Sequence, residues 1–138
     1  MDLMQSLMIS AAGMKVQGER LRVVAENLAN ADSVAETPGG DPYRRKTITF
    51  RNEMDRALGL ETVQVDKVGT DRSDFRMKYD PGNPAADAKG YVLMPNVNAL
   101  IGRSEMTDMR EAQRSYEATL RAIEVARTML QRTIDLLR

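Results

Sequence analysis

The chain has 138 residues, of which 42% are hydrophobic and 29% charged, and its 20 basic and 20 acidic residues give a formal net charge of zero at pH 7. That balance provides no general attraction to nucleic acid or to an anionic membrane surface. The absence of Cys and His excludes thiol nucleophiles, disulfides, the usual zinc sites and an imidazole acting as general base.

The first predicted element is an amphipathic helix over residues 3–29. Asp2 and Gln5 resemble a capping box at its start. Asn27 and Asn30 are expected to end it, because Asn tolerates the left-handed backbone conformation that terminates many helices.

Apolar residues along this helix recur in three- and four-residue steps, which is the a/d spacing of a coiled coil. They are Met4, Leu7, Ala11, Met14, Gly18, Leu21, Ala25 and Leu28. Glycine lowers the helix propensity of a segment. Because Gly18 lies on the seam, we interpret it as a site where a facing helix approaches closely; the alternative is a destabilising glycine without a role.

Residues 32–103 carry turn signals and short strand patterns instead. Polar and apolar residues alternate over 62–68 and 74–79, as in half-buried strands, and 69–73 is expected to close them into a hairpin. Smaller elements are expected as strands at 46–50 and 90–95 and as a helical turn at 53–58. A hairpin with one apolar face is marginally stable in water, so this segment is expected to order against the terminal helices or neighbouring subunits. The basic run 43–46 is interpreted as a solvated loop rather than a phosphate site.

A second helix is expected from Glu105 to the last residue, with Ser104 as its N-cap. Its seam residues repeat the a/d spacing. They are Met106, Met109, Gln113, Tyr116, Leu120, Ile123, Arg127, Leu130, Ile134 and Leu137. Charges alternate in sign along one flank, either to select a partner helix or as a solvated salt-bridged face.

These patterns predict a mainly α-helical protein in which long N- and C-terminal helices pair as a coiled coil around a small irregular, hairpin-containing middle. The predicted segments are 1–31, 32–103 and 104–138. The residues predicted to pack helices in an assembly are Leu7, Ala11, Met14, Leu21, Ala25, Asn27, Leu28, Asn30, Met109, Tyr116, Leu120, Ile123, Leu130, Ile134 and Leu137.

Catalysis is not expected. The loop carboxylates do not lie in apolar runs that would adapt them to acid–base chemistry, and the sequence has neither a P-loop nor a dinucleotide fingerprint. No stretch approaches the roughly 18 apolar residues of a membrane span, and the N-terminus lacks the positive region of a secretory signal. We therefore predict no cofactor, metal, nucleic acid or small-molecule substrate.

Several stretches resemble one known family. The sequence Asn-Leu-Ala-Asn-Ala-Asp-Ser at 27–33 resembles the signature of bacterial flagellar rod and hook axial proteins. Residues 42–46, 79–97 and 114–118 further resemble the C-type proximal rod proteins of that family. Thr119 departs from the pattern, because family members tend to carry Asn there.

The resemblance implies a structural subunit of the flagellar basal-body rod, the drive shaft that spans the periplasm. It implies export through the flagellar type III apparatus without a cleaved signal, and terminal helices that form a tube around the export channel. The implied partners are copies of this chain, other rod proteins, a membrane-ring or rod-base adaptor and the export gate. The alternative from the residues alone is a cytoplasmic coiled-coil adaptor or export chaperone.

Overall fold

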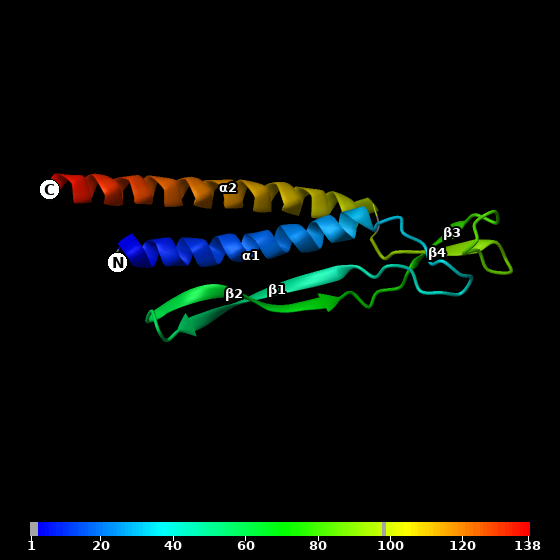
Figure 1. Ribbon diagram of the computed structural model, residues 1–138. Coiled ribbons are helices and arrows are strands. Elements are labelled where there is room, and N and C mark those ends of the chain that lie inside the picture. The colour runs from blue at the N-terminus through cyan, green and yellow to red at the C-terminus, as the bar shows by residue number, and fades with distance from the viewer. Residues whose placement is uncertain (1–2, 98) are drawn as a thin grey trace. The chain divides into compact units, whose positions relative to one another are not determined.

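The computed structural model describes residues 3–97 and 99–138 (Figure 1). The elements in chain order are α1 (Leu3–Ala29), β1 (Lys46–Asp55), β2 (Leu60–Thr70), β3 (Arg76–Tyr79), β4 (Tyr91–Met94) and α2 (Ala99–Leu136). β1 pairs with β2 in one two-stranded sheet, and β3 pairs with β4 in another.

The chain divides into two compact units, and several elements contribute to both. Unit 1 comprises the chain up to Leu21, Thr49–Lys67 and Arg110–Arg138. Unit 2 comprises Arg22–Ile48 and Val68–Met109.

The predicted coiled coil with a small β-containing middle is wrong, although the two helices are terminal as expected. β1 and β2 have 10 and 11 residues, so their hairpin is a major element. In unit 1, side chains of α1 and of this hairpin line a common groove, so α1 has a β partner that a helical repeat does not reveal. Among the described residues, the buried apolar residues of α1 are Val16, which lines that groove, and Val23 and Val24 in unit 2. None of them lies on the predicted seam.

α1 has the predicted bounds, while Asp2 of the proposed capping box lies outside the described residues. The Asn30 side-chain amide donates to the Glu26 carbonyl (2.8 Å), as does the Asn30 backbone amide (3.1 Å). No described residue other than glycine has a positive φ. The expectation of a left-handed Asn is therefore wrong. The helix ends where the bonds change from i→i−4 to i→i−3, as the Ala31 amide donates to the Leu28 carbonyl (3.3 Å) and the Ser33 amide to the Asn30 carbonyl (3.1 Å).

The strand pairing differs from the sequence expectation. β1 covers the first half of the predicted helical turn at 53–58, because it ends at Asp55. The chain reverses after Asp55, whose carbonyl accepts hydrogen bonds from the Leu58 and Gly59 amides (3.3 and 2.8 Å). Gly59 has φ +65°, a conformation that only glycine adopts without strain. The turn therefore joins β1 to β2, and the predicted pairing of 62–68 with 74–79 is wrong.

The second sheet carries the apolar core of unit 2. β3 and β4 are antiparallel, with Met77 opposite Leu93 and Tyr79 opposite Tyr91. Because side chains alternate along a strand, Val92 and Met94 point to the other face, where they pack with Ala85, Val34 and Ala86. The strand predicted at 90–95 is confirmed by β4.

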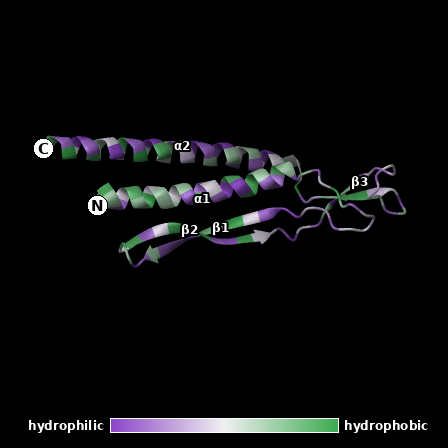
Figure 2. Ribbon diagram, in the orientation of Figure 1, coloured by the Kyte–Doolittle hydropathy of each residue, from purple (hydrophilic) through white to green (hydrophobic). Residues whose placement is uncertain are grey.

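α2 begins at Ala99, so the prediction of Ser104 as N-cap is wrong. Ala and Leu at the start of this helix are strong helix formers, and they extend it toward the end of β4. Hydrophilic and hydrophobic residues intermix along its whole length (Figure 2). Among the described residues, neither helix has an apolar stretch sufficient to cross a membrane.

Candidate assembly site

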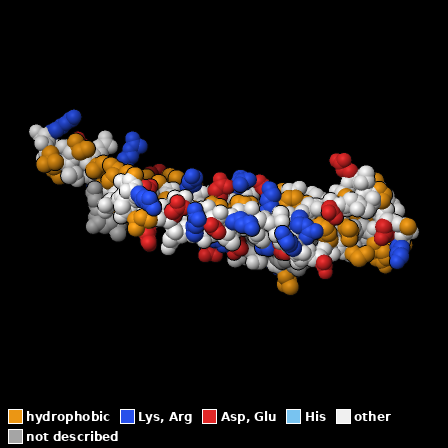
Figure 3. Space-filling view, turned by 90° about the horizontal axis from the view of Figure 1, so that it is seen from below, with side chains coloured by type: hydrophobic (Ala, Val, Ile, Leu, Met, Phe, Trp, Pro, Cys, Tyr) orange, Lys and Arg blue, Asp and Glu red, His pale blue; other side chains and the backbone are white. Residues whose placement is uncertain are grey.

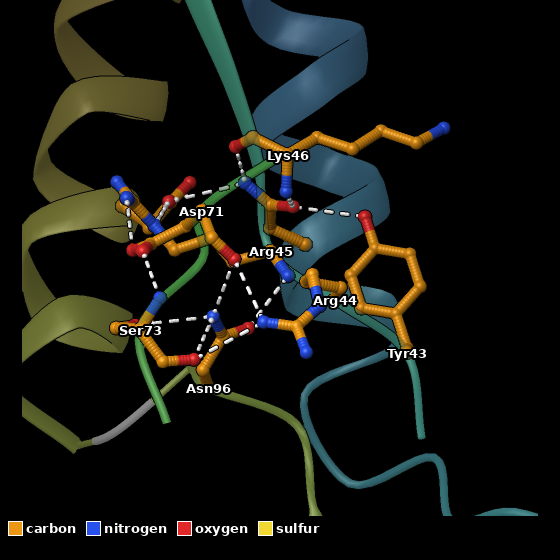
Figure 4. Close-up of polar contacts among 9 residues, drawn as sticks. Tyr43, Arg44, Arg45, Lys46, Asp71, Ser73 and Asn96 are labelled. Atoms are coloured by element: carbon orange, nitrogen blue, oxygen red, sulfur yellow. Dashed lines mark hydrogen bonds and ion pairs between the residues drawn. The ribbon is translucent and has the colours of Figure 1, made fainter. Parts of the chain in front are cut away.

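A network of polar side chains fastens the segments of unit 2 to one another (Figure 4). We call it the polar junction. It consists of Asn27, Tyr43, Arg44, Arg45, Lys46, Asp71, Ser73, Asn96 and Glu105.

Asn27, on the last turns of α1, lies at the centre of the polar junction and is only 1% exposed. Its Nδ2 donates to the Lys46 carbonyl (2.9 Å) and to Glu105 Oε1 (3.1 Å). Its Oδ1 accepts from the Tyr43 hydroxyl and from the Lys46 amide, both at 2.8 Å. An amide side chain has two donors and two acceptor positions, so Asn27 is fully satisfied. It joins α1, the start of β1 and α2 through one side chain.

A buried ion pair adds charge to this junction. Glu105 is 3% exposed, and its Oε1 also accepts a hydrogen bond from Arg45 Nε (2.8 Å). Arg45 Nη1 reaches Asp71 Oδ2 at 3.4 Å. A carboxylate this deeply buried is stable in its charged form only when paired. Arg45 therefore compensates the charge that α2 brings into unit 2.

Asn96 holds the loop before β3. Its Oδ1 accepts from the Arg45 amide (2.7 Å), and its Nδ2 donates to the Asp71 carbonyl (3.0 Å) and to Ser73 Oγ (3.1 Å). Arg44 donates to the Asp71 and Ser73 carbonyls and stacks over the Phe75 ring, 4.1 Å from its centroid. These contacts explain why the residues after β2 form a loop that is hydrogen-bonded to Asn96 and Arg44 rather than a hairpin turn.

The titratable groups around the junction are shifted in the directions that their partners impose. The hydrogen bond from Lys46 is the main cause that lowers the pKa of Glu26. Hydrogen bonds from the Ser73 amide and then from the Ser73 side chain, followed by Arg45, lower the pKa of Asp71. Burial, reinforced by two nearby carboxylates, raises the pKa of the Tyr43 hydroxyl. Each group is thereby held in the form that its hydrogen bonds require.

The polar junction has the character of a structural contact that holds the segments of unit 2 together. Its ions are paired and its amides are satisfied, although the second carboxylate oxygen of Glu105, Oε2, is buried without a hydrogen-bond partner. Among the described residues no group of three or more His, Cys, Asp or Glu could hold a metal ion. The interpretation of residues 43–46 as a solvated loop is wrong, because Tyr43, Arg44, Arg45 and Lys46 all bond into the junction.

In contrast, the end of α2 presents an apolar surface to solvent. Leu130, Ile134 and Leu137 are 38%, 50% and 84% exposed. Leu130 and Ile134, at i and i+4, share one face of α2. Leu137 directly follows the last residue of the helix, and its amide donates to the Ile134 carbonyl (3.2 Å). Monomeric proteins rarely leave a continuous apolar face uncovered, so the end of α2 has the character of a contact surface.

Comparisons with known proteins agree on one family. Residues 88–136 match the family model described as flagellar basal body rod FlgEFG protein C-terminal. The chain is 58% identical to the flagellar basal-body rod protein FlgC of Agrobacterium fabrum, over 94% of this chain and 91% of that protein. It is 40% identical to FlgC of Salmonella typhimurium, over 99% and 98% of the two chains, and 34% identical to FlgC of Bacillus subtilis, over 99% of each.

The chain belongs to the FlgC family of flagellar basal-body rod proteins.

This membership confirms the predicted function and location. The FlgC-family chain is a structural subunit of the bacterial flagellar basal-body rod, and the alternative of a cytoplasmic adaptor or export chaperone is not favoured. Its relatives are structural rod proteins rather than enzymes, and it assembles with other rod components.

The predicted assembly residues of this FlgC-family chain have varied environments. The half-buried ones are Leu7, Met14, Leu21, Leu28, Asn30, Met109, Tyr116 and Ile123. The exposed ones are Ala11, Ala25, Leu120, Leu130, Ile134 and Leu137. Asn27 alone in the predicted set is buried, and it bonds to residues outside that set. The assembly role of these residues stays a prediction.

Sequence reasoning missed most of the junction, notably Arg45, Asp71, Asn96 and Glu105. One available signal was Asn96, which interrupts the apolar run from Val92 to Val97, because a polar side chain in such a run is normally buried with hydrogen-bond partners. Glu105 had no comparable signal, since helix surfaces carry many glutamates.

Proposed function

We propose that this rod subunit polymerises through its terminal helices, with the exposed apolar face of α2 as the main contact surface. The observation that carries this proposal is the exposure of Leu130 and Ile134 on one face of α2, continued by exposed Leu137 directly after the helix. Burying them against a neighbour removes apolar area from water, which contributes about 25 cal/mol per Å².

The same face is covered nearer the middle of α2. Ala112 is fully buried, and Tyr116 and Ile123 are half-buried, on the face that continues into Leu130. Within unit 1, α2 runs past the described start of α1 (Figure 1). This face of α2 is therefore buried near the middle of the helix and exposed near its C-terminal end. A neighbouring subunit would bury the exposed part.

A second exposed apolar row supports contacts on more than one side. Val125, Met129 and Leu136 are 55%, 59% and 87% exposed and lie roughly opposite Leu130 and Ile134 at 100° per residue. Hydrophobic side chains gather over this end of α2 (Figure 3). A helix that is apolar on two faces suits a position inside a wall of packed helices.

The remaining parts of the proposal follow from the same role. Subunits stack around the export channel, span the periplasm and arrive through the flagellar type III apparatus without a cleaved signal. The rod-base adaptor and the export gate are the further partners. The subunit performs no catalysis. The polar junction contributes to the stiffness that torque transmission requires, since its hydrogen bonds hold several segments of unit 2 in one arrangement.

The test is Leu130→Asp in a strain that lacks the native gene. Leu130 is partly exposed in the single chain, so its charge should leave folding intact while blocking incorporation into basal bodies and motility. Thr128→Asp is the matched control, because Thr128 is exposed between the two apolar rows. Basal bodies that contain Leu130→Asp at native levels would contradict the proposal, whereas normal secretion of a variant that is not incorporated would support it.

A further inference from the structure

Unit 1 contains a groove between α1 and the β1–β2 hairpin, with a volume of about 410 Å³. α1 contributes Met8, Ala12 and Val16, which follow one another at four-residue spacing. The remaining lining comes from Lys15 and Glu19 of α1 and from Asp55, Leu58, Thr62, Val63, Gln64 and Val65 of the hairpin. The groove thus has a mixed lining, in which apolar side chains from both elements stand beside polar and charged ones.

The small side chain of Ala12 leaves a depression on the α1 side of this groove, between two larger residues. Met8 and Val16 lie one helical turn to either side of it, so a side chain that enters from outside meets a depression. Knobs from one helix enter holes of this kind on another surface. The volume also lies in the range of sites that bind ligands specifically.

The open end of α2 matches this groove in spacing and length. Leu130 and Ile134 of α2, with Leu137 directly after its last residue, have the i, i+4, i+7 spacing of helices that bind in grooves. They extend over about 10 Å of helix at 1.5 Å per residue, and the α1 side of the groove from Met8 to Glu19 extends over about 16 Å. One to two turns of α2 therefore fit along it.

The charges are complementary as well. The groove carries one cation, Lys15, and two carboxylates, Glu19 and Asp55. The apolar face of α2 is flanked by Arg127, Asp135 and Arg138, which gives two cations and one carboxylate. Charges at the rim of an interface fix orientation and favour encounter, so this pairing favours the end of α2 over an acidic or uncharged helix.

We propose that the groove between α1 and the β1–β2 hairpin binds the C-terminal end of α2 from a second copy of this chain. This inference rests on the proposed assembly through α2 and names the surface that receives it. The contact joins two different patches, so it is heterologous, and such contacts form open helical assemblies unless the rotation closes a ring.

The chain contains no cysteine, so single cysteines report this contact directly. Purified Ala12→Cys and Ile134→Cys chains are mixed and oxidised mildly, then separated without reductant. The expected product is a mixed disulfide that neither variant forms alone, because a bridge needs Cβ atoms within about 4.5 Å. Thr128→Cys in place of Ile134→Cys is the control and should give much less product. Equal yields from both mixtures, or none from either, would overturn the proposal.

A second experiment separates this inference from the proposed function. Ala12→Trp fills the groove and should block incorporation into basal bodies, with circular dichroism used to check that the variant folds. Mixed with Ile134→Asp it should form heterodimers, since each chain keeps one intact patch. If Leu130→Asp blocks the rod but Ala12→Trp does not and no mixed disulfide forms, α2 docks elsewhere and only the groove is wrong. If Leu130→Asp builds rods, the assembly role of α2 itself is wrong.

Discussion

Asn27 makes four hydrogen bonds from a nearly fully buried side chain. Its amide bonds to a carbonyl, a carboxylate, a hydroxyl and a backbone amide while almost fully buried. Neither a longer side chain nor a charged one can make all four of these hydrogen bonds. The residue therefore tests whether the polar junction stabilises unit 2.

Asn27→Ala is expected to lower the free energy of unfolding by at least about 2 kcal/mol, because unsatisfied buried groups cost about 1–3 kcal/mol each. Asn27→Asp should cost more at pH 7, since it places a second carboxylate about 3 Å from that of Glu105. At pH 5 the difference should shrink as the new carboxyl gains a proton. Urea unfolding at both pH values measures this. Asn30→Asp, at a residue with only local bonds, is the control, and equal losses for both Asn27 variants at pH 7 would contradict the argument.

Acid should weaken the chain through Asp71 and Glu26. Their pKa values are lowered from ordinary values of 3.8 and 4.5 by Ser73 and by Lys46 respectively. Because the unfolded carboxyls bind protons at higher pH than the folded ones, this stabilisation is complete above the unfolded pKa values and is lost as pH falls through the folded ones. Asp71→Asn should flatten the fall in urea midpoint below pH 4.5, with Asp74→Asn as the control. An unchanged slope would contradict this.

At the residue level, sequence patterns identified some positions but not their roles. Asn27 and Asn30 were singled out as helix-ending and assembly residues, yet Asn27 lies within α1 and bonds across unit 2. The partners of a polar side chain depend on which distant segments the fold brings together. Residues 43–46, 71–73, 96 and 105 are too far apart in sequence for spacing to reveal that they meet.

At the level of elements, periodicity gave the helices and missed the pairing of strands. The a/d steps located both terminal helices, since a buried face on one helix imposes a local repeat. The strand partners were wrong because alternation shows that a strand has two faces and says nothing about its neighbour. The turn at Gly59 pairs β1 with β2. The sequence alone did not single it out, because the same segment contains other glycine-containing turns that could have joined two strands.

Glycines in different elements should respond oppositely to the same substitution. A Cβ at Gly18 or at Gly59 would meet nothing within 4 Å, so the predicted close packing at Gly18 does not occur within the chain. Gly18→Ala should stabilise the isolated chain by about 0.5–1 kcal/mol, because alanine is the better helix former. Gly59→Ala should destabilise it by about 1–2 kcal/mol, since a left-handed conformation is costly for alanine.

Urea or thermal unfolding of the purified chains compares the two. Gly90→Ala extends the series, because its φ is +82° and an added Cβ would lie 2.9 Å from the Tyr79 ring, so it should cost more than Gly59→Ala. A destabilising Gly18→Ala in the isolated chain would contradict the assignment. A stable Gly18→Ala chain that fails to enter basal bodies would show that a neighbouring subunit approaches α1 closely there.

For the whole molecule, family resemblance supplied the function while the sequence could not supply the geometry of assembly. A single chain defines its own helices through local repeats. Which surface meets which neighbour depends on faces such as Leu130–Leu137 and the α1 groove, and these become recognisable only when burial is known. The coiled-coil prediction expected the same apolar seams to pack the two helices together and to contact neighbouring copies, and the spacing alone could not divide that surface between the two roles.

The two units should differ in stability until assembly occurs. Among the described residues, the buried apolar ones in unit 2 are Val23, Val24, Ala85, Val92, Met94 and Val97, against Val16 and Ala112 in unit 1. Few buried contacts and exposed backbone allow local opening. Amides of α2 beyond Leu120 should therefore exchange with deuterium at least about tenfold faster than those of β4, as mass spectrometry of the dilute chain would measure.

Incorporation into the rod should reverse this difference. Burial of the open end of α2 links its ordering to binding, so exchange beyond Leu120 should slow by at least about tenfold in isolated basal bodies. β4 should change little, because Val92 and Met94 are already buried in the single chain. The Leu130→Asp chain provides the unassembled reference under the same conditions. Equal protection of α2 and β4 in the dilute chain would mean that α2 is stable without neighbours, and assembly would then join preformed subunits rather than complete them.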